Sequence, residues 1–138
     1  MKKMKTTTTV ILSAAVLLSS SVLFAETYFP PERIQCKQDN QRNVTCQGFD
    51  AQYLMIGGVD GVNNLSDRRI TLNFLSGRAI YKGGLAFSYQ TSDNAVTVHL
   101  VNASPRVQPD YSQQRFWREV APGLFACNSY LTCGVTTA

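Results

Sequence analysis

The stretch from Arg69 to Val101, "RITLNFLSGRAIYKGGLAFSYQTSDNAVTVHLV", decides the predicted fold. Apolar and polar residues alternate in three parts of it, at 69–75, 85–90 and 95–101. Period-two alternation that is rich in aromatic and β-branched residues is typical of half-buried strands. We therefore predict an antiparallel meander with one face on the core. The core-facing residues of its three strands are predicted to be Ile70, Leu72, Phe74, Leu85, Phe87, Tyr89, Val96, Val98 and Leu100.

Turn residues punctuate this meander. The segment Thr91–Asn94 predicts a hairpin turn between the last two strands, because Asp and Asn favour turn conformations. The segment Ser76–Arg78 is predicted to turn the chain after the first strand. The segment Lys82–Gly84 predicts either another turn or a β-bulge.

A different pattern follows the meander, in "DYSQQRFWREV" at 110–120. Asp110 and Gln113 have the spacing of a capping box, and Pro122 and Gly123 are hostile to a continuing helix. We therefore predict one short C-terminal helix, and a mainly β domain that is an antiparallel sandwich or small barrel.

The only tryptophan, Trp117, lies in this predicted helix between Arg115 and Arg118. An aromatic ring between arginines can be part of a ligand or partner surface, where all three residues would be binding residues. The same ring can instead cover the open side of the sheet, with the arginines in solvent. The sequence favours the second role and leaves the first open.

The N-terminus predicts export. A basic start, "MKKMK", is followed by the uncharged apolar run "VILSAAVLLSSSVLFA" at 10–25. This order is typical of a secretory signal peptide at 1–25, cleaved after Ala25. The run is short for a membrane span, which needs roughly 20 apolar residues. We expect a periplasmic or secreted domain at 26–138, with no stable membrane anchor after cleavage.

Cleavage changes the charge. The chain has 13 basic and 9 acidic residues, a net charge of +4. Loss of Lys2, Lys3 and Lys5 lowers this to +1. Because a nucleic-acid-binding domain usually has a strongly basic face, we expect no nucleic-acid partner.

The domain has four cysteines, Cys36, Cys46, Cys127 and Cys133. An even number in a small exported domain predicts disulfides, and three pairings are possible. We favour the local pairs Cys36–Cys46 and Cys127–Cys133, with bridges between the two ends of the domain as the alternative. Gaps of nine and five residues between these cysteines, and a single histidine, are poor for zinc. We predict no metal and no cofactor.

Motifs for catalysis are sparse. His99 is the only histidine and lies inside a predicted strand, which favours a structural or surface position. No nucleophile elbow, HExxH motif or phosphate-binding loop is present in the sequence. Two of the scattered carboxylates could still meet as a glycosidase pair, so a small secreted hydrolase stays an alternative.

The layout resembles small exported proteins of Gram-negative bacteria that have no assigned activity. The segment 75–98 also resembles a stretch of the periplasmic C-type lysozyme inhibitors, through Ser76-Gly77, Tyr81, Phe87 and Ala95. Members of that family are small β-barrels that insert a serine-bearing loop into the lysozyme cleft. The resemblance implies that Ser76 and Tyr81 are binding residues and that a host hydrolase such as lysozyme is the partner.

The sequence therefore favours an exported, non-catalytic binding module. Its expected ligand is a protein or glycan outside the cytoplasm. Inhibition of a host hydrolase is a narrower form of this hypothesis.

Overall fold

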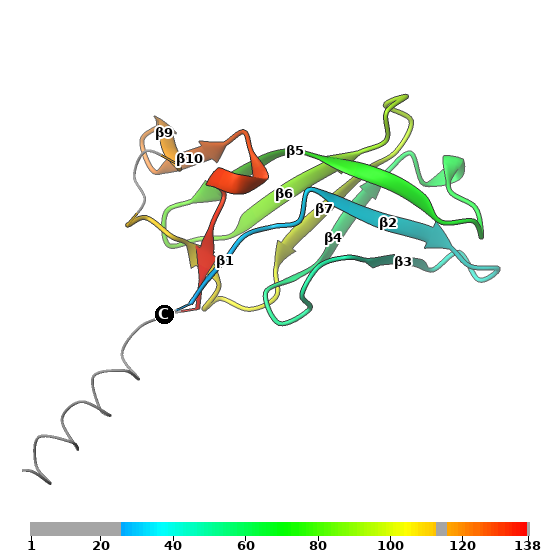
Figure 1. Cartoon of the computed structure of the whole chain (residues 1–138), viewed down its shortest axis with the longest axis horizontal. Helices are drawn as coiled ribbons and strands as arrows, with labels where there is room; N and C mark the ends of the chain where they lie inside the picture. Colours follow the sequence, from blue (N-terminus) through cyan, green and yellow to red (C-terminus); the bar gives the residue numbers. More distant parts are fainter. Residues whose placement is uncertain (1–25, 113–115, 138) are drawn as a thin grey trace, which may run out of the picture.

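The protein is built almost entirely from antiparallel strands (Figure 1). The computed structural model describes residues 26–112 and 116–137, so the predicted signal peptide lies outside the described residues. The elements are β1 Thr27–Tyr28, β2 Arg33–Gln38, β3 Val44–Gln47, β4 Leu54–Asp60, the 3-10 turn η1 Val62–Asn64, β5 Ile70–Ile80, β6 Leu85–Gln90, β7 Thr97–Asn102, β8 Gln108–Pro109, β9 Arg118–Ala121, β10 Leu124–Cys127, the 3-10 turn η2 Tyr130–Thr132 and β11 Val135–Thr136. Within the described residues, no helix is both long and apolar enough to cross a membrane.

The predicted meander is confirmed. Strands β5, β6 and β7 pair in this order, and both pairs are antiparallel. The alternation places its apolar residues in the core as expected. Ile70 and Phe74 are half-buried and the other seven are buried, namely Leu72, Leu85, Phe87, Tyr89, Val96, Val98 and Leu100.

The predicted turn at Ser76–Arg78 is wrong, because β5 continues through it to Ile80. The chain turns at the next site, where Lys82 adopts a left-handed φ of 57°. The two halves of β5 have different partners on one side. The first residues of β5 pair with β2, and its last four residues pair with β10, which is distant in the sequence.

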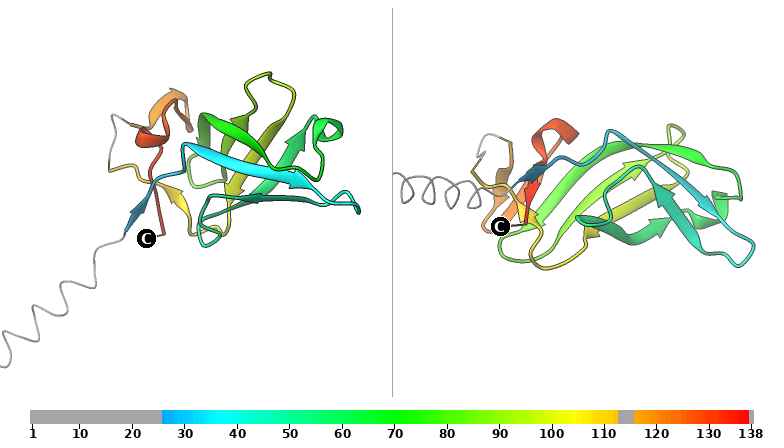
Figure 2. Two further views of the ribbon diagram at one scale, coloured as in Figure 1. Left: turned by 45° about the vertical axis from the view of Figure 1, so that its right-hand side comes forward. Right: turned by 60° about the horizontal axis from the view of Figure 1, so that its bottom comes forward.

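The larger sheet has the order β3-β2-β5-β6-β7-β4, and β10 joins it through β5. The sheet bends so strongly that it forms a nearly closed barrel (Figure 2). A small sheet of β1, β11 and β8 lies at the end that also carries β9 and β10 (Figure 1). The mainly β, sandwich-or-barrel class is therefore confirmed.

Both local disulfides are confirmed. Cys36 and Cys46 face each other across β2 and β3, and Cys127 and Cys133 close a loop that contains η2. On the chain-entropy model, loops of 10 and 6 residues are each worth about 2–3 kcal/mol. Two such bridges point to an oxidising, extracytoplasmic environment.

The helix predicted over 110–120 is wrong at its C-terminal end, where Arg118–Ala121 form β9. The segment Ala121-Pro122-Gly123-Leu124 does not stop a helix. It turns the chain between β9 and β10, and Gly123 supplies the left-handed φ of 74°. Pro followed by Gly suits such a turn as well as it suits a helix end. Residues 113–115 lie outside the described part of the chain.

Asp110 forms a local turn instead of a helix cap. Its carboxylate accepts hydrogen bonds from the backbone and hydroxyl of Ser112, and from Thr27 Oγ1 at 2.7 Å. Partial burial would raise the pKa of Asp110, but the hydrogen bonds outweigh it and hold that pKa below its ordinary value. The carboxylate thus ties the start of the domain to the segment after β8.

Candidate functional site

A pocket of about 590 Å³ opens at the end of the barrel that carries β9 and β10. We call it the tyrosine pocket, and its lining residues are Tyr81, Tyr111, Trp117, Arg118, Glu119 and Phe125. Its position follows from the hairpins around it. The Tyr81 N–H donates to the Gly123 carbonyl at 2.8 Å, which ties the β5–β6 turn to the β9–β10 turn.

Three aromatic rings form a continuous wall in the pocket. The Tyr81 and Tyr111 ring centroids are 5.7 Å apart, and those of Tyr111 and Phe125 are 4.9 Å apart. Both pairs are tilted, which is a favoured geometry for aromatic contacts. Tyr81 is 55% exposed, so the outer end of this wall faces solvent.

The pocket also contains polar groups that can still form hydrogen bonds or ion pairs with a ligand. The Tyr111 hydroxyl is buried and has no hydrogen-bond partner among the described residues. Burial, together with the nearby Tyr81, raises the pKa of Tyr111, so the hydroxyl keeps its proton at neutral pH and can donate. Within residues 26–112 and 116–137, Arg118 takes part in no ion pair.

Trp117 forms the floor of the pocket and belongs to the core. It is 2% exposed, its ring packs against Phe87, and its Nε1–H donates to the Gly134 carbonyl at 2.9 Å. The structure therefore confirms the second of the two roles considered for this ring, which is covering one end of the sheet. Arg118 is exposed beside it, and Arg115 lies outside the described residues.

The two residues taken from the lysozyme-inhibitor resemblance lie apart. Tyr81 is in the pocket, whereas Ser76 is inside β5 and pairs directly with Ser88. Gly77, the next residue, faces the core next to Phe87 and Cys127, so Ser76 points to the outer face of the sheet. A serine at this place is held in a strand and is not part of a protruding loop.

A second pocket of about 370 Å³ shares Tyr81 and Tyr111 with the first. Its other lining residues are Lys82, Pro105 and Gln108. The Lys82 ammonium lies 5.5 Å from the centre of the Tyr81 ring. The tyrosine pair thus separates two adjoining depressions, and both have aromatic surface next to charged or amide groups.

The sequence did not single out Tyr111, Glu119 or Phe125. Tyr111 and Glu119 lie within the segment 110–120 that was predicted to be a helix, and Phe125 lies on β10, so no local pattern could group them. No set of three or more His, Cys, Asp or Glu side chains within the described residues could hold a metal ion.

Comparison with known proteins assigns no family. The chain matches no protein-family model, no curated protein and no solved structure.

Proposed function

We propose that the protein is an exported binding module, acting in the periplasm or after secretion, and that the tyrosine pocket binds another protein. The observation that carries this proposal is the wall of three rings that ends at an exposed tyrosine. Tyrosine and arginine are enriched among residues that dominate binding energy, because they bury large surfaces and still offer a polar end.

The surroundings of the pocket favour a protein over a glycan. Ile80, next to Tyr81, is 61% exposed, and Val120, next to Glu119, is 51% exposed. Such aliphatic side chains gain from burial against another apolar surface, whereas a sugar would leave them largely in water. Arg118 and Glu119 provide charges of both signs, which can fix the orientation of a partner.

Binding to a defined panel tests this proposal. The oxidised protein is immobilised and exposed to C-type lysozyme, other secreted hydrolases, and purified envelope glycans. For the ligand that binds, Tyr81→Ala should weaken affinity at least tenfold, since about 1.4 kcal/mol is a tenfold change. Met55→Ala is the matched control, because Met55 is 50% exposed on β4, outside the pocket.

Equal affinity of wild type and Tyr81→Ala for that ligand would show that the pocket is not the binding site. Binding to a glycan alone would replace the protein partner by a carbohydrate. For lysozyme, the turnover of the enzyme is measured in addition to binding. Unchanged lysozyme turnover at a stoichiometric excess of this protein would remove the inhibitor hypothesis.

A further inference from the structure

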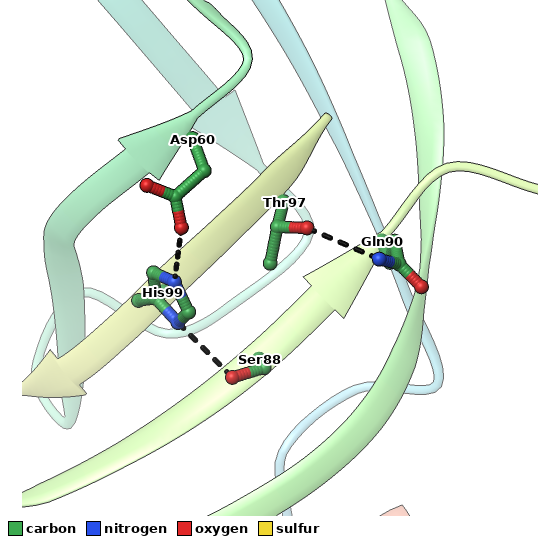
Figure 3. Close-up of polar contacts among 5 residues, drawn as sticks. All are labelled: Asp60, Ser88, Gln90, Thr97 and His99. Atoms are coloured by element: carbon green, nitrogen blue, oxygen red, sulfur yellow. Dashed lines mark hydrogen bonds and ion pairs between the residues drawn. The ribbon is translucent and has the colours of Figure 1, made fainter. Parts of the chain in front are cut away.

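Three polar side chains form a hydrogen-bonded row on the outer face of the barrel (Figure 3). Ser88 Oγ lies 3.0 Å from His99 Nδ1, and His99 Nε2 lies 3.0 Å from Asp60 Oδ2. Each comes from a different strand, β6, β7 and β4. Ser88 and His99 are a direct cross-strand pair, and Asp60 reaches the ring from two residues beyond Gly58, which pairs with His99.

One proton arrangement satisfies both hydrogen bonds of a neutral imidazole. A carboxylate can only accept, so the hydrogen on the ring belongs on Nε2, facing Asp60. The lone pair on Nδ1 then accepts the hydrogen of the Ser88 hydroxyl. A serine hydroxyl aimed at an imidazole base, with a carboxylate holding the opposite side of the ring, is the arrangement of an activated nucleophile.

The backbone on both sides of this pair is irregular. The pairing of β5 with β6 shifts register between Phe74 and Ser76, next to Ser88. The pairing of β4 with β7 shifts between Ile56 and Gly58, next to His99. A Cβ added at Gly58 would have its nearest neighbour, a ring carbon of His99, 3.9 Å away, so the glycine leaves space beside the ring. Bulges of this kind recur next to active sites, where they redirect side chains.

The row is also accessible. The His99 side chain is 35% exposed and that of Asp60 is 78% exposed. Ser88 is half-buried, so a small reagent can reach this row from the outer face without any change in the fold.

We propose that Ser88 is a nucleophile that accepts an acyl group from small activated esters, with His99 as its base. Ser88 Oγ forms a bond to the acyl carbon and passes its proton to His99 Nδ1, while Asp60 stabilises the imidazolium. The bond to the leaving alkoxide breaks, and the alkoxide takes that proton from His99. A water molecule then gives a proton to the freed Nδ1 while its oxygen forms a bond to the acyl carbon. The bond between the acyl carbon and Ser88 Oγ breaks, Oγ takes the proton back from Nδ1, and the carboxylic acid leaves.

The site supplies a base but few other catalytic groups. Strands β6 and β7 each have a partner on both sides, so their N–H groups serve the sheet and not a developing oxyanion. Loss of a single oxyanion donor costs known enzymes about 10²–10³ in rate. A positioned base alone contributes about 10²–10⁴, so Ser88 should be acylated faster than an ordinary serine and then turn over slowly.

A fluorophosphonate probe tests the nucleophile directly, because attack forms the Ser88 Oγ–P bond, breaks the P–F bond and leaves the proton on His99. Intact-mass kinetics and peptide mapping then locate the adduct. Ser76 is an internal reference, since it lies beside Ser88 on the same face. We expect labelling of Ser88 to be at least tenfold faster than that of Ser76.

Variants identify the base. His99→Asn keeps a polar group near Ser88 but cannot take up the proton, so it should lower the Ser88 rate to that of Ser76. Asp60→Asn, at an exposed position, should lower it in part without affecting the fold. Thr97→Ala is the matched control, because Thr97 lies on β7 in a separate hydrogen bond to Gln90 (Figure 3). Equal labelling of Ser88 and Ser76, or an unchanged rate in folded His99→Asn, would overturn the proposal.

Discussion

Replacing Trp117 by phenylalanine should destabilise the protein by about 2–3 kcal/mol. The indole loses its hydrogen bond to the Gly134 carbonyl, which is worth about 1 kcal/mol. That carbonyl still accepts from the Asp110 N–H at 2.8 Å, so it is not left wholly unpaired. The smaller ring leaves a void against Phe87, and a void of this size costs about 1–2 kcal/mol. For a domain of this length, the melting temperature should fall by about 10 °C.

Urea unfolding followed by far-UV circular dichroism measures this change in Trp117→Phe. The matched control is Leu131→Ala, at a position that is 62% exposed, where less than about 0.5 kcal/mol is expected. In the wild type, tryptophan emission should be blue-shifted and protected from iodide. A red-shifted, quenchable signal from the folded protein, or a loss below 0.5 kcal/mol in Trp117→Phe, would refute the assignment of this ring to the core.

Three further predictions follow from local features. Gly77→Ala should destabilise the fold by about 1–3 kcal/mol, because the added Cβ would lie 2.5 Å from Cys127 Sγ. Gly84→Ala is the control, because a Cβ there meets only ordinary van der Waals contacts. Thermal melts of the two variants measure the difference. Because the pKa of Asp110 is lowered in the folded protein, its carboxylate stabilises the fold above about pH 4, and this contribution is lost as the pH falls through the pKa of the folded state. The decline in unfolding free energy between about pH 4 and pH 2 should therefore be shallower in Asp110→Asn than in the wild type. Equal slopes would contradict this. N-terminal sequencing of the protein expressed with its leader should begin at Glu26, and an intact leader would exclude cleavage at Ala25.

The wrong helix shows where local reasoning fails. The segment 110–120 has a capping-box spacing and an apolar pair four residues apart, and both are real local preferences. They lose because Arg118–Ala121 can pair with β10 across a Pro-Gly turn, and β10 in turn adds to the far half of β5. Backbone pairing with a strand already anchored in the barrel outweighs the weak preference of a short helix.

The Ser88–His99 pair was only partly within reach of the sequence. A turn at Thr91–Asn94 would place Gln90 opposite Ala95 and Ser88 opposite Thr97. In the structure Thr91 bonds to Val96 instead, and this shift of the register pairs Ser88 with His99. Asp60 was not predictable, because β4 precedes β7 by almost 40 residues and a bulge shifts their register. Pairing between distant strands leaves no periodic trace in either one.

The three strands of the meander and their buried faces followed from the sequence alone, which also favoured the local disulfides without excluding the other pairings. Each of these depends on residues that are close along the chain, where a side-chain period or a short loop sets the geometry. The fold as a whole was needed to establish that Trp117 is buried, that Tyr81, Tyr111 and Phe125 form one wall, and that Asp60 completes the row on the outer face. These features arise where segments far apart in sequence are brought together by sheet pairing, and the physical reason is that contact between them is favourable only after the barrel has formed.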